Sequence, residues 1–96
     1  MVVMRNAKAK GTRNEHRTMR LLESMGYACT RAAASLGAWD VIGIGPTDVV
    51  LVQVKTNRWP GSLELEALQE FRAPPNARKL LHRWDTRQRA PRVREL

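Results

Sequence analysis

The sequence has few of the features that would place it in a membrane or an oxidising compartment. Its 96 residues include one cysteine, Cys29, which excludes an intramolecular disulfide and a cysteine-rich zinc cluster. No apolar run approaches the roughly 20 residues that span a bilayer. The apolar opening at Met1–Met4 is too short for a signal peptide. We therefore expect a cytoplasmic protein with no membrane partner.

Acidic residues are scarce and unevenly placed. The chain has 9 Asp and Glu against 17 Lys and Arg, for a net charge of +8. Residues 1–20 and 72–96 are strongly basic, whereas residues 21–71 hold six of the acids and are net negative. A small protein this basic most often binds a polyanion, and nucleic acid is the usual one. Basic ends around an acidic middle would suit a protein that grips phosphates and holds metal ions, although a merely solvated basic surface would look the same.

The length allows a single domain, and the hydrophobic pattern predicts its class. With 43% hydrophobic residues the chain can form one small core and no second one. The most apolar segment, Val49–Lys55, predicts a central strand buried on both faces. The predicted order is helix, three strands, helix and strand, at residues 12–25, 27–34, 39–44, 49–55, 63–72 and 79–84. Such an alternation indicates an α/β domain, a small mixed β-sheet flanked by helices.

The two ends of the chain are predicted to lie outside this domain. Residues 1–11 are expected to form a flexible basic arm that ends at Gly11. Residues 12–85 would be the single folded domain. Residues 86–96 are basic and contain Pro91, which predicts a tail that is disordered or bound to a partner.

Glu15 has two interpretations. Thr12 is a plausible helix N-cap, and Glu15 three residues later would complete a capping box. Glu15 also lies on the same helical stripe as Met19 and Leu22, so its carboxylate could instead point inward at a cation. The sequence leaves both open. Gly26 is the expected end of this helix.

Asp40, Gln53 and Lys55 stand where packing alone would not place them. Asp40 interrupts an apolar run at the start of a strand, and burying it requires a partner or a metal. Gln53 and Lys55 share one face of the central strand by period-two geometry. Two oxygen-bearing side chains on adjacent strands, with the Val54 carbonyl, can hold Mg²⁺ beside a lysine. The alternatives are a solvent-facing Asp40 and a solvated Lys55 at a strand end.

These residues resemble a known family. The chain is similar to the PD-(D/E)XK nuclease superfamily, and most closely to the archaeal-type Holliday junction resolvases. The resemblance rests on Lys10–Glu15, Met25–Tyr27, Arg31–Ser35, Trp39–Ile42 and Gln53–Lys55. It implies a restriction-endonuclease-like core, and a cytoplasmic location in a bacterial, archaeal or phage-infected host cell.

The resemblance also implies three sets of functional residues. The catalytic set would be Glu15, Ser35, Asp40, Gln53 and Lys55. The metal, Mg²⁺ with Mn²⁺ as a substitute, would be held by Asp40, Gln53, the Val54 backbone carbonyl and, through water, Glu15. DNA would be contacted by Lys10, Arg13, Arg17, Arg31 and Arg58. One departure stands out, because Gln53 occupies a position where the superfamily usually has Glu or Asp.

The implied function is metal-dependent resolution of four-way DNA junctions by paired symmetric nicks, performed by a homodimer. Candidates for the dimer interface are apolar residues of the second predicted helix, Leu63, Leu65, Leu68 and Phe71. One alternative is a nuclease of the same superfamily that cuts other branched, nicked or flap DNA. The other is a DNA-binding relative without catalysis, which the Gln53 departure brings into consideration.

Four aromatic or imidazole side chains are assigned more ordinary roles. Trp39, Trp59 and Trp84 could stack on bases, but in so small a core at least two of them are expected to serve packing. His82, on a short strand, is expected to be structural.

Overall fold

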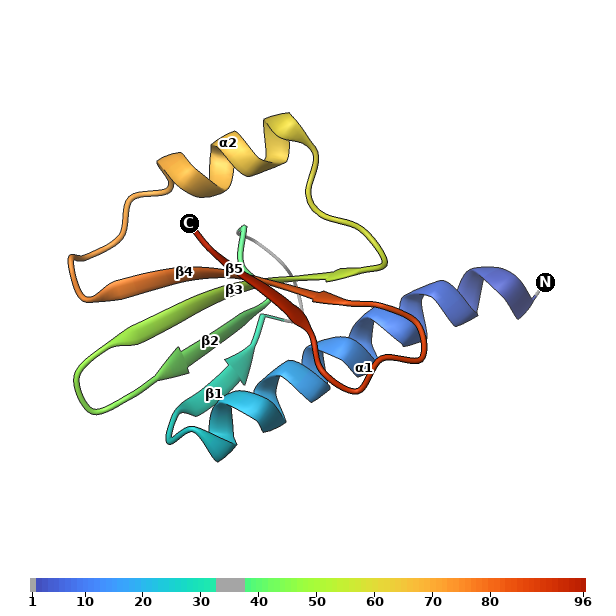
Figure 1. Ribbon diagram of the computed structural model, residues 1–96, viewed down its shortest axis with the longest axis horizontal. Coiled ribbons are helices and arrows are strands. Elements are labelled where there is room, and N and C mark those ends of the chain that lie inside the picture. Colours follow the sequence, from blue (N-terminus) through green and yellow to red (C-terminus); the bar gives the residue numbers. More distant parts are fainter. Residues whose placement is uncertain (1, 33–37) are drawn as a thin grey trace.

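A computed structural model describes residues 2–32 and 38–96, and its centre is the apolar strand β3 (Val49–Thr56). β-branched residues favour this extended, buried position. β3 is third in a five-stranded sheet ordered β1-β2-β3-β4-β5 (Figure 1). The other strands are β1 (Ala28–Arg31), β2 (Val41–Ile44), β4 (Ala77–Trp84) and β5 (Arg92–Glu95). The predicted central position of this strand is confirmed.

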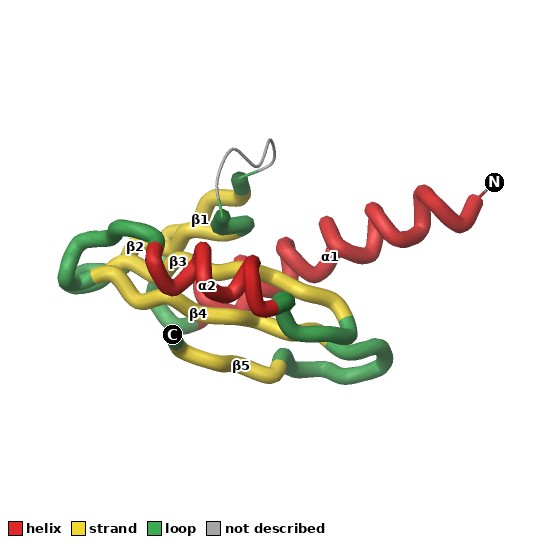
Figure 2. The backbone as a smooth tube through the Cα atoms, turned by 90° about the horizontal axis from the view of Figure 1, so that it is seen from above, coloured by secondary structure: helices red, strands yellow, loops and turns green. Residues whose placement is uncertain are grey.

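The sheet is mixed, as predicted. β1, β2 and β3 pair antiparallel in succession, β3 and β4 are parallel, and β4 pairs antiparallel with β5. The parallel pair needs a crossover, which contains α2 (Ser62–Glu70). Helix α1 (Val2–Ser24) crosses one face of the sheet and α2 covers the other (Figure 1). Viewed from above, the first turns of α1 project beyond the sheet (Figure 2).

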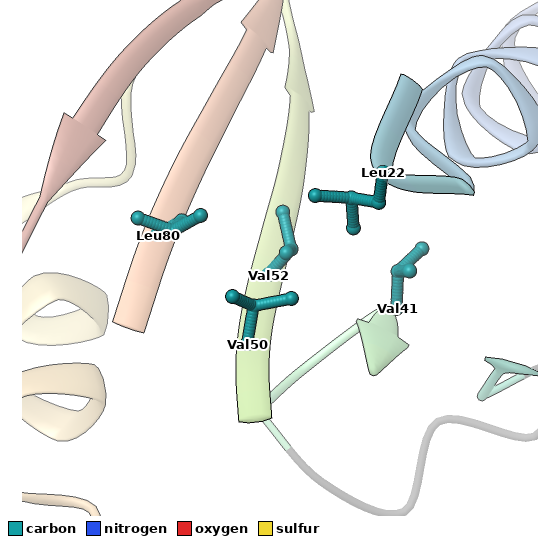
Figure 3. Close-up of a cluster of buried hydrophobic side chains, with 5 residues drawn as sticks. All are labelled: Leu22, Val41, Val50, Val52 and Leu80. Atoms are coloured by element: carbon teal, nitrogen blue, oxygen red, sulfur yellow. The ribbon is translucent and has the colours of Figure 1, made fainter. Parts of the chain in front are cut away.

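The centre of the sheet face under α1 is an apolar layer. Leu22 of α1 is buried among side chains of three strands, Val41, Val50, Val52 and Leu80 (Figure 3). Asn14 and Thr18 are also buried, so α1 turns the same stripe to the sheet every fourth residue. The helix ends at Ser24, and Gly26, the residue predicted to stop it, has a φ of 100°, in the left-handed region.

The start of α1 differs from its prediction. The helix begins at Val2, so residues 2–11 continue it and are not an irregular arm. Ala, Lys and Arg are strong helix formers and outweigh the roughly 1 kcal/mol that Gly11 costs. Thr12 is therefore inside the helix and caps nothing. This removes the capping-box interpretation of Glu15.

The C-terminal segment was also predicted wrongly, because residues 92–95 are β5. Without a neighbour on this side, β4 would have an open edge with a row of unpaired backbone donors and acceptors. β5 pairs with these groups. The turn before β5 is fastened to α1: Arg17 Nη2 donates to the Gln88 carbonyl at 2.8 Å, and Lys10 Nζ donates to Thr86 Oγ1 at 2.9 Å. The last eleven residues thus belong to the folded unit.

A second apolar cluster lies under α2. Trp39, Leu51, Leu68 and Leu81 are buried together there. Leu68 is 1% exposed and belongs to this core, so it was wrongly considered for a dimer interface. Leu63 is 81% exposed and stays a candidate, as does the more weakly exposed Phe71. Among the described residues, no helix is long and apolar enough to cross a membrane.

His82 has the structural role expected of it. Its Nδ1 lies 3.1 Å from Thr18 Oγ1, and the same oxygen accepts a 2.8 Å hydrogen bond from Trp84 Nε1. Because Trp84 can only donate, the Thr18 hydroxyl proton is free for a neutral His82 ring. Burial lowers the pKa of His82 to about 4, which keeps the imidazole uncharged at neutral pH.

Candidate active site

Asp40 lies directly before β2 and is fastened to β3 twice. Its backbone N–H donates to the Val52 carbonyl at 2.9 Å, and its Oδ2 accepts the Val54 N–H at 2.9 Å. The interpretation of Asp40 as a solvated strand-end residue is therefore wrong. A carboxylate tied to the backbone of the central strand has a fixed position beside Gln53 and Lys55.

Burial raises the pKa of the Asp40 carboxyl above its usual range. The negative charges of Glu15 and Glu64 raise the pKa further, whereas the Val54 N–H and the Lys55 ammonium lower it. Folding therefore makes the charged form of Asp40 less favourable than in water. Such an unfavourable charge is common at functional sites, where a substrate or cation can compensate it.

Gln53 and Lys55 project from the face of β3 opposite to Val52, as predicted. Gln53 is 9% exposed and its Nε2 donates to Glu64 Oε2 at 3.2 Å. The Lys55 ammonium forms an ion pair with Glu64 Oε1 at 2.9 Å. Lys55 is consequently held by a specific partner and is not a solvated strand end.

Glu64 is the residue that sequence reasoning missed. It lies in the first turn of α2, where an acid is favoured by the helix dipole alone. The apolar residues predict the helix, and nothing in that pattern distinguishes Glu64 from the other two acids of the segment, Glu66 and Glu70. The sequence did contain one signal for such a residue. Position 53 has Gln in place of the usual acid, so a second carboxylate for the site would have to come from another segment.

Glu15 points from α1 toward the strands, as its second interpretation required. Its Oε1 forms an ion pair with Arg31 Nη1 of β1 at 3.0 Å, and both side chains are partly buried. Arg31 is paired with Val41 in the sheet, directly next to Asp40, so the ion pair lies near the site. Arg31 is thus engaged by Glu15 in this structure, and its contact with a phosphate stays a prediction.

The remaining candidates for DNA contact fall into two groups. Arg13 and Arg58 are exposed. Arg17 instead lies 4.1 Å from the centre of the Trp84 ring and donates to Asn14 Oδ1 at 3.1 Å. Arg17 therefore packs against the fold in addition to any role on DNA. Ser35 lies outside the described residues.

The tryptophans serve packing, as expected for at least two of them. Trp39 and Trp84 are buried. Trp59 is half-buried against the cluster under α2, and the Arg83 and Arg94 guanidinium groups lie 5.6 Å and 5.2 Å from its ring centre. Its ring is accordingly engaged by cations within the chain.

The donor chemistry of the site fits a hard cation. In residues 2–32 and 38–96, no three His, Cys, Asp or Glu side chains are placed to hold a metal by themselves. Mg²⁺ does not need such a cage, since it is usually bound by one or two carboxylates and keeps several waters. Asp40 with the neutral oxygens of Gln53 and Val54 is a set of this kind.

The arrangement defines a class of protein. An aspartate before the second strand, a Gln-Val-Lys motif at the end of the third, and a helix on each face form a core of the PD-(D/E)XK nuclease type. The sheet order and the convergence of Asp40 on the Gln53–Lys55 segment are the features that define it.

Comparison with known proteins identifies the family within this class. The sequence profile described as archaeal Holliday junction resolvase (Hjc) matches residues 6–70, and the chain belongs to that family. A solved structure of Hjc, a Holliday junction resolvase from the archaeal hyperthermophile Archaeoglobus fulgidus, has the same fold. The TM-score is 0.72 at 23% identity, over 90% of this chain and 72% of that one. No curated protein matches.

Proposed function

We propose that this chain resolves four-way DNA junctions by Mg²⁺-dependent hydrolysis of phosphodiester bonds, with paired symmetric nicks. Membership of the resolvase family supports the substrate. The observation that supports the chemistry is the Val54 N–H bond to Asp40, which fixes a carboxylate beside the lysine of the same strand segment. A DNA substrate also agrees with the net charge of +8 and a cytoplasmic location.

In this proposal, some residues of the site would bind the metal ion and others would act on the attacking water and the phosphate. Asp40, the Gln53 amide oxygen and the Val54 carbonyl would hold Mg²⁺ or Mn²⁺, with Glu15 acting through water. The bound ion would polarise the phosphoryl oxygen and make water a better nucleophile. The Lys55 ammonium would orient the attacking water and stabilise negative charge on the phosphorane. Ser35 would lie near the scissile phosphate.

DNA binding and pairing of subunits complete the proposal. Exposed Arg13 and Arg58, together with Lys10, Arg17 and Arg31, would contact phosphates without reading sequence. A homodimer would present two sites to a two-fold junction, one for each nicked strand. Leu63, 81% exposed on α2, is the best-placed apolar residue for the subunit contact.

The experiment compares a synthetic four-way junction with a linear duplex of the same sequence, in Mg²⁺ or EDTA. We expect paired nicks in the junction alone, abolished by EDTA and by Asp40→Ala. Equal cutting of the duplex would indicate a nuclease for other DNA forms. Tight binding to the junction without cutting, in both Mg²⁺ and Mn²⁺, would indicate a non-catalytic relative.

A further inference from the structure

The metal ligands expected from the motif provide little negative charge. Gln53 and the Val54 carbonyl are neutral, so Asp40 is the one charged group among these three ligands. Glu15 is paired with Arg31 at 3.0 Å. A divalent cation at this site would therefore meet one carboxylate and an adjacent ammonium, which is a weak arrangement when affinity depends on the charge of the ligands.

Glu64 brings a carboxylate to the place where charge is missing. It comes from α2, yet its Oε2 lies 3.2 Å from Gln53 Nε2 and its Oε1 lies 2.9 Å from Lys55 Nζ. One carboxylate thus contacts both polar side chains of the motif. An ionised carboxylate has about four lone-pair sites, so these two contacts leave acceptor capacity. The side chain is 41% exposed, which leaves it accessible to a hydrated ion.

We propose that Glu64 is a metal ligand, the second carboxylate of the site, in place of the acid that position 53 lacks. This inference deepens the proposed function and rests on it. The helix that covers the sheet would then contribute directly to the active site. With Glu64 counted, three carboxylates face two cations, Lys55 and Arg31, and the site has the net negative charge that Mg²⁺ requires.

The attachment of Asp40 to β3 supports this placement independently. Asp40 Oδ2 accepts the Val54 N–H at 2.9 Å, and Glu64 contacts the side chains of Gln53 and Lys55, the residues on either side of Val54. Both carboxylates are therefore held by the same three-residue segment of β3. A divalent cation held by both would bring attraction where two like charges otherwise meet.

A competing role for Glu64 is purely positional. In that case the residue would only orient Lys55 and Gln53 through the two contacts observed, and it would not touch the cation. Both roles predict that cleavage falls when Glu64 is changed. They differ in whether an acid at position 53 restores the affinity for metal, because a carboxylate there supplies the missing charge but does not rebuild the contacts of Glu64.

The test measures Mn²⁺ binding to the full chain by electron paramagnetic resonance, so that it does not depend on cleavage. Glu64→Gln keeps the size of the side chain and one acceptor oxygen for Lys55, and it removes the charge. We expect Mn²⁺ affinity to fall by at least about tenfold. Glu66→Gln, an identical change at an exposed position of the same helix, should bind Mn²⁺ like the parent chain.

A double variant provides the decisive comparison. Gln53→Glu combined with Glu64→Gln returns the acid to the motif, and we expect it to recover Mn²⁺ affinity that Glu64→Gln alone has lost. Unchanged affinity in Glu64→Gln would overturn the inference, and so would a double variant as weak as the single one. A parent chain that binds Mn²⁺ through Glu64 but cuts no junction would contradict the proposed function alone.

Discussion

The two faces of the sheet are built from the same strand but differ in character. On the α1 face, Val50 and Val52 of β3 pack under Leu22 in a closed apolar layer. On the α2 face, Leu51 is apolar, but Gln53 and Lys55 then carry polar groups out to Glu64. Both faces therefore bury an apolar cluster that stabilises the fold. The α2 face differs because the end of β3 on that side also carries the polar groups of the candidate site.

The largest effect is expected on the α2 face, for activity and not for stability. Asp40→Asn should reduce junction cleavage by roughly 10²–10³-fold, the loss typical of removing one preorganised charged or polar group. Because the pKa of Asp40 is raised in the folded chain, its charge opposes folding. The variant should thus unfold at the same or a higher denaturant concentration, measured without metal.

The matched control for Asp40→Asn is Asp48→Asn. Asp48 accepts a hydrogen bond from the Tyr27 hydroxyl at 2.9 Å, away from the motif, and Asn keeps an acceptor there. The rate of junction cleavage by this variant should stay within about twofold of the rate of the parent chain. Equal losses in both variants would mean that charge anywhere in the chain, and not the site, limits cleavage.

The next largest effect belongs to the α1 face. Leu22→Ala removes a side chain that is 2% exposed at the centre of the apolar layer and should cost about 2–5 kcal/mol of unfolding free energy. Denaturant unfolding followed by circular dichroism measures this loss. At temperatures where the variant is folded, Mn²⁺ affinity should match that of the parent chain. A lowered affinity would show that the two faces are coupled.

A smaller effect on the same face depends on pH. The pKa of His82 is about 4 when folded and about 6.5 when unfolded, so the unfolded chain binds the proton first. Stability should therefore fall as pH decreases from about 6.5 to 4, by at most about 3 kcal/mol. Unfolding measured across this range tests it. In His82→Asn, which keeps an acceptor for Thr18 and cannot titrate, this part of the slope should vanish.

The smallest effect is expected at the surface. Arg78 donates to both oxygens of Glu95 at 3.0 and 2.9 Å, but both side chains are close to half exposed. Glu95→Gln should change the unfolding free energy by less than about 1 kcal/mol. Thermal melts at low and high salt check this, since a screened pair loses its contribution at high salt. A larger change would mean that β5 contributes more to the fold than its exposure suggests.

Helices and strands could be predicted from the sequence where the conformational preferences of the residues and the local hydrophobic pattern indicated the same structure. The β-branched run of β3 and the stop at Gly26 needed no tertiary information. The helical start at Val2 was missed because Gly11 and Thr12 look like a boundary, and contacts such as Lys10 with Thr86 join segments 76 residues apart. β5 was missed for a related reason. Its four residues are all exposed, and only the open edge of β4 makes them a strand.

The site was predictable in the same uneven way. Asp40, Gln53 and Lys55 break apolar patterns, and a broken pattern is visible in sequence. Glu64 breaks none, since an acid in the first turn of a helix is ordinary. Its contact with Lys55 depends on where the crossover helix lies over the sheet, and no local pattern specifies that placement.

The hydrogen bond between Thr18 and His82 has a consequence for synthesis of the protein. Thr18 and His82 are 64 positions apart in the sequence. Trp84, which donates to the same Thr18 hydroxyl, is 66 positions from Thr18. Translation makes α1 before β4, so Thr18 is synthesised well before the strand that holds its hydrogen-bonding partners. Until β4 emerges, the Thr18 hydroxyl lacks His82 and Trp84, although Leu22 of the same helix can already pack on β2 and β3.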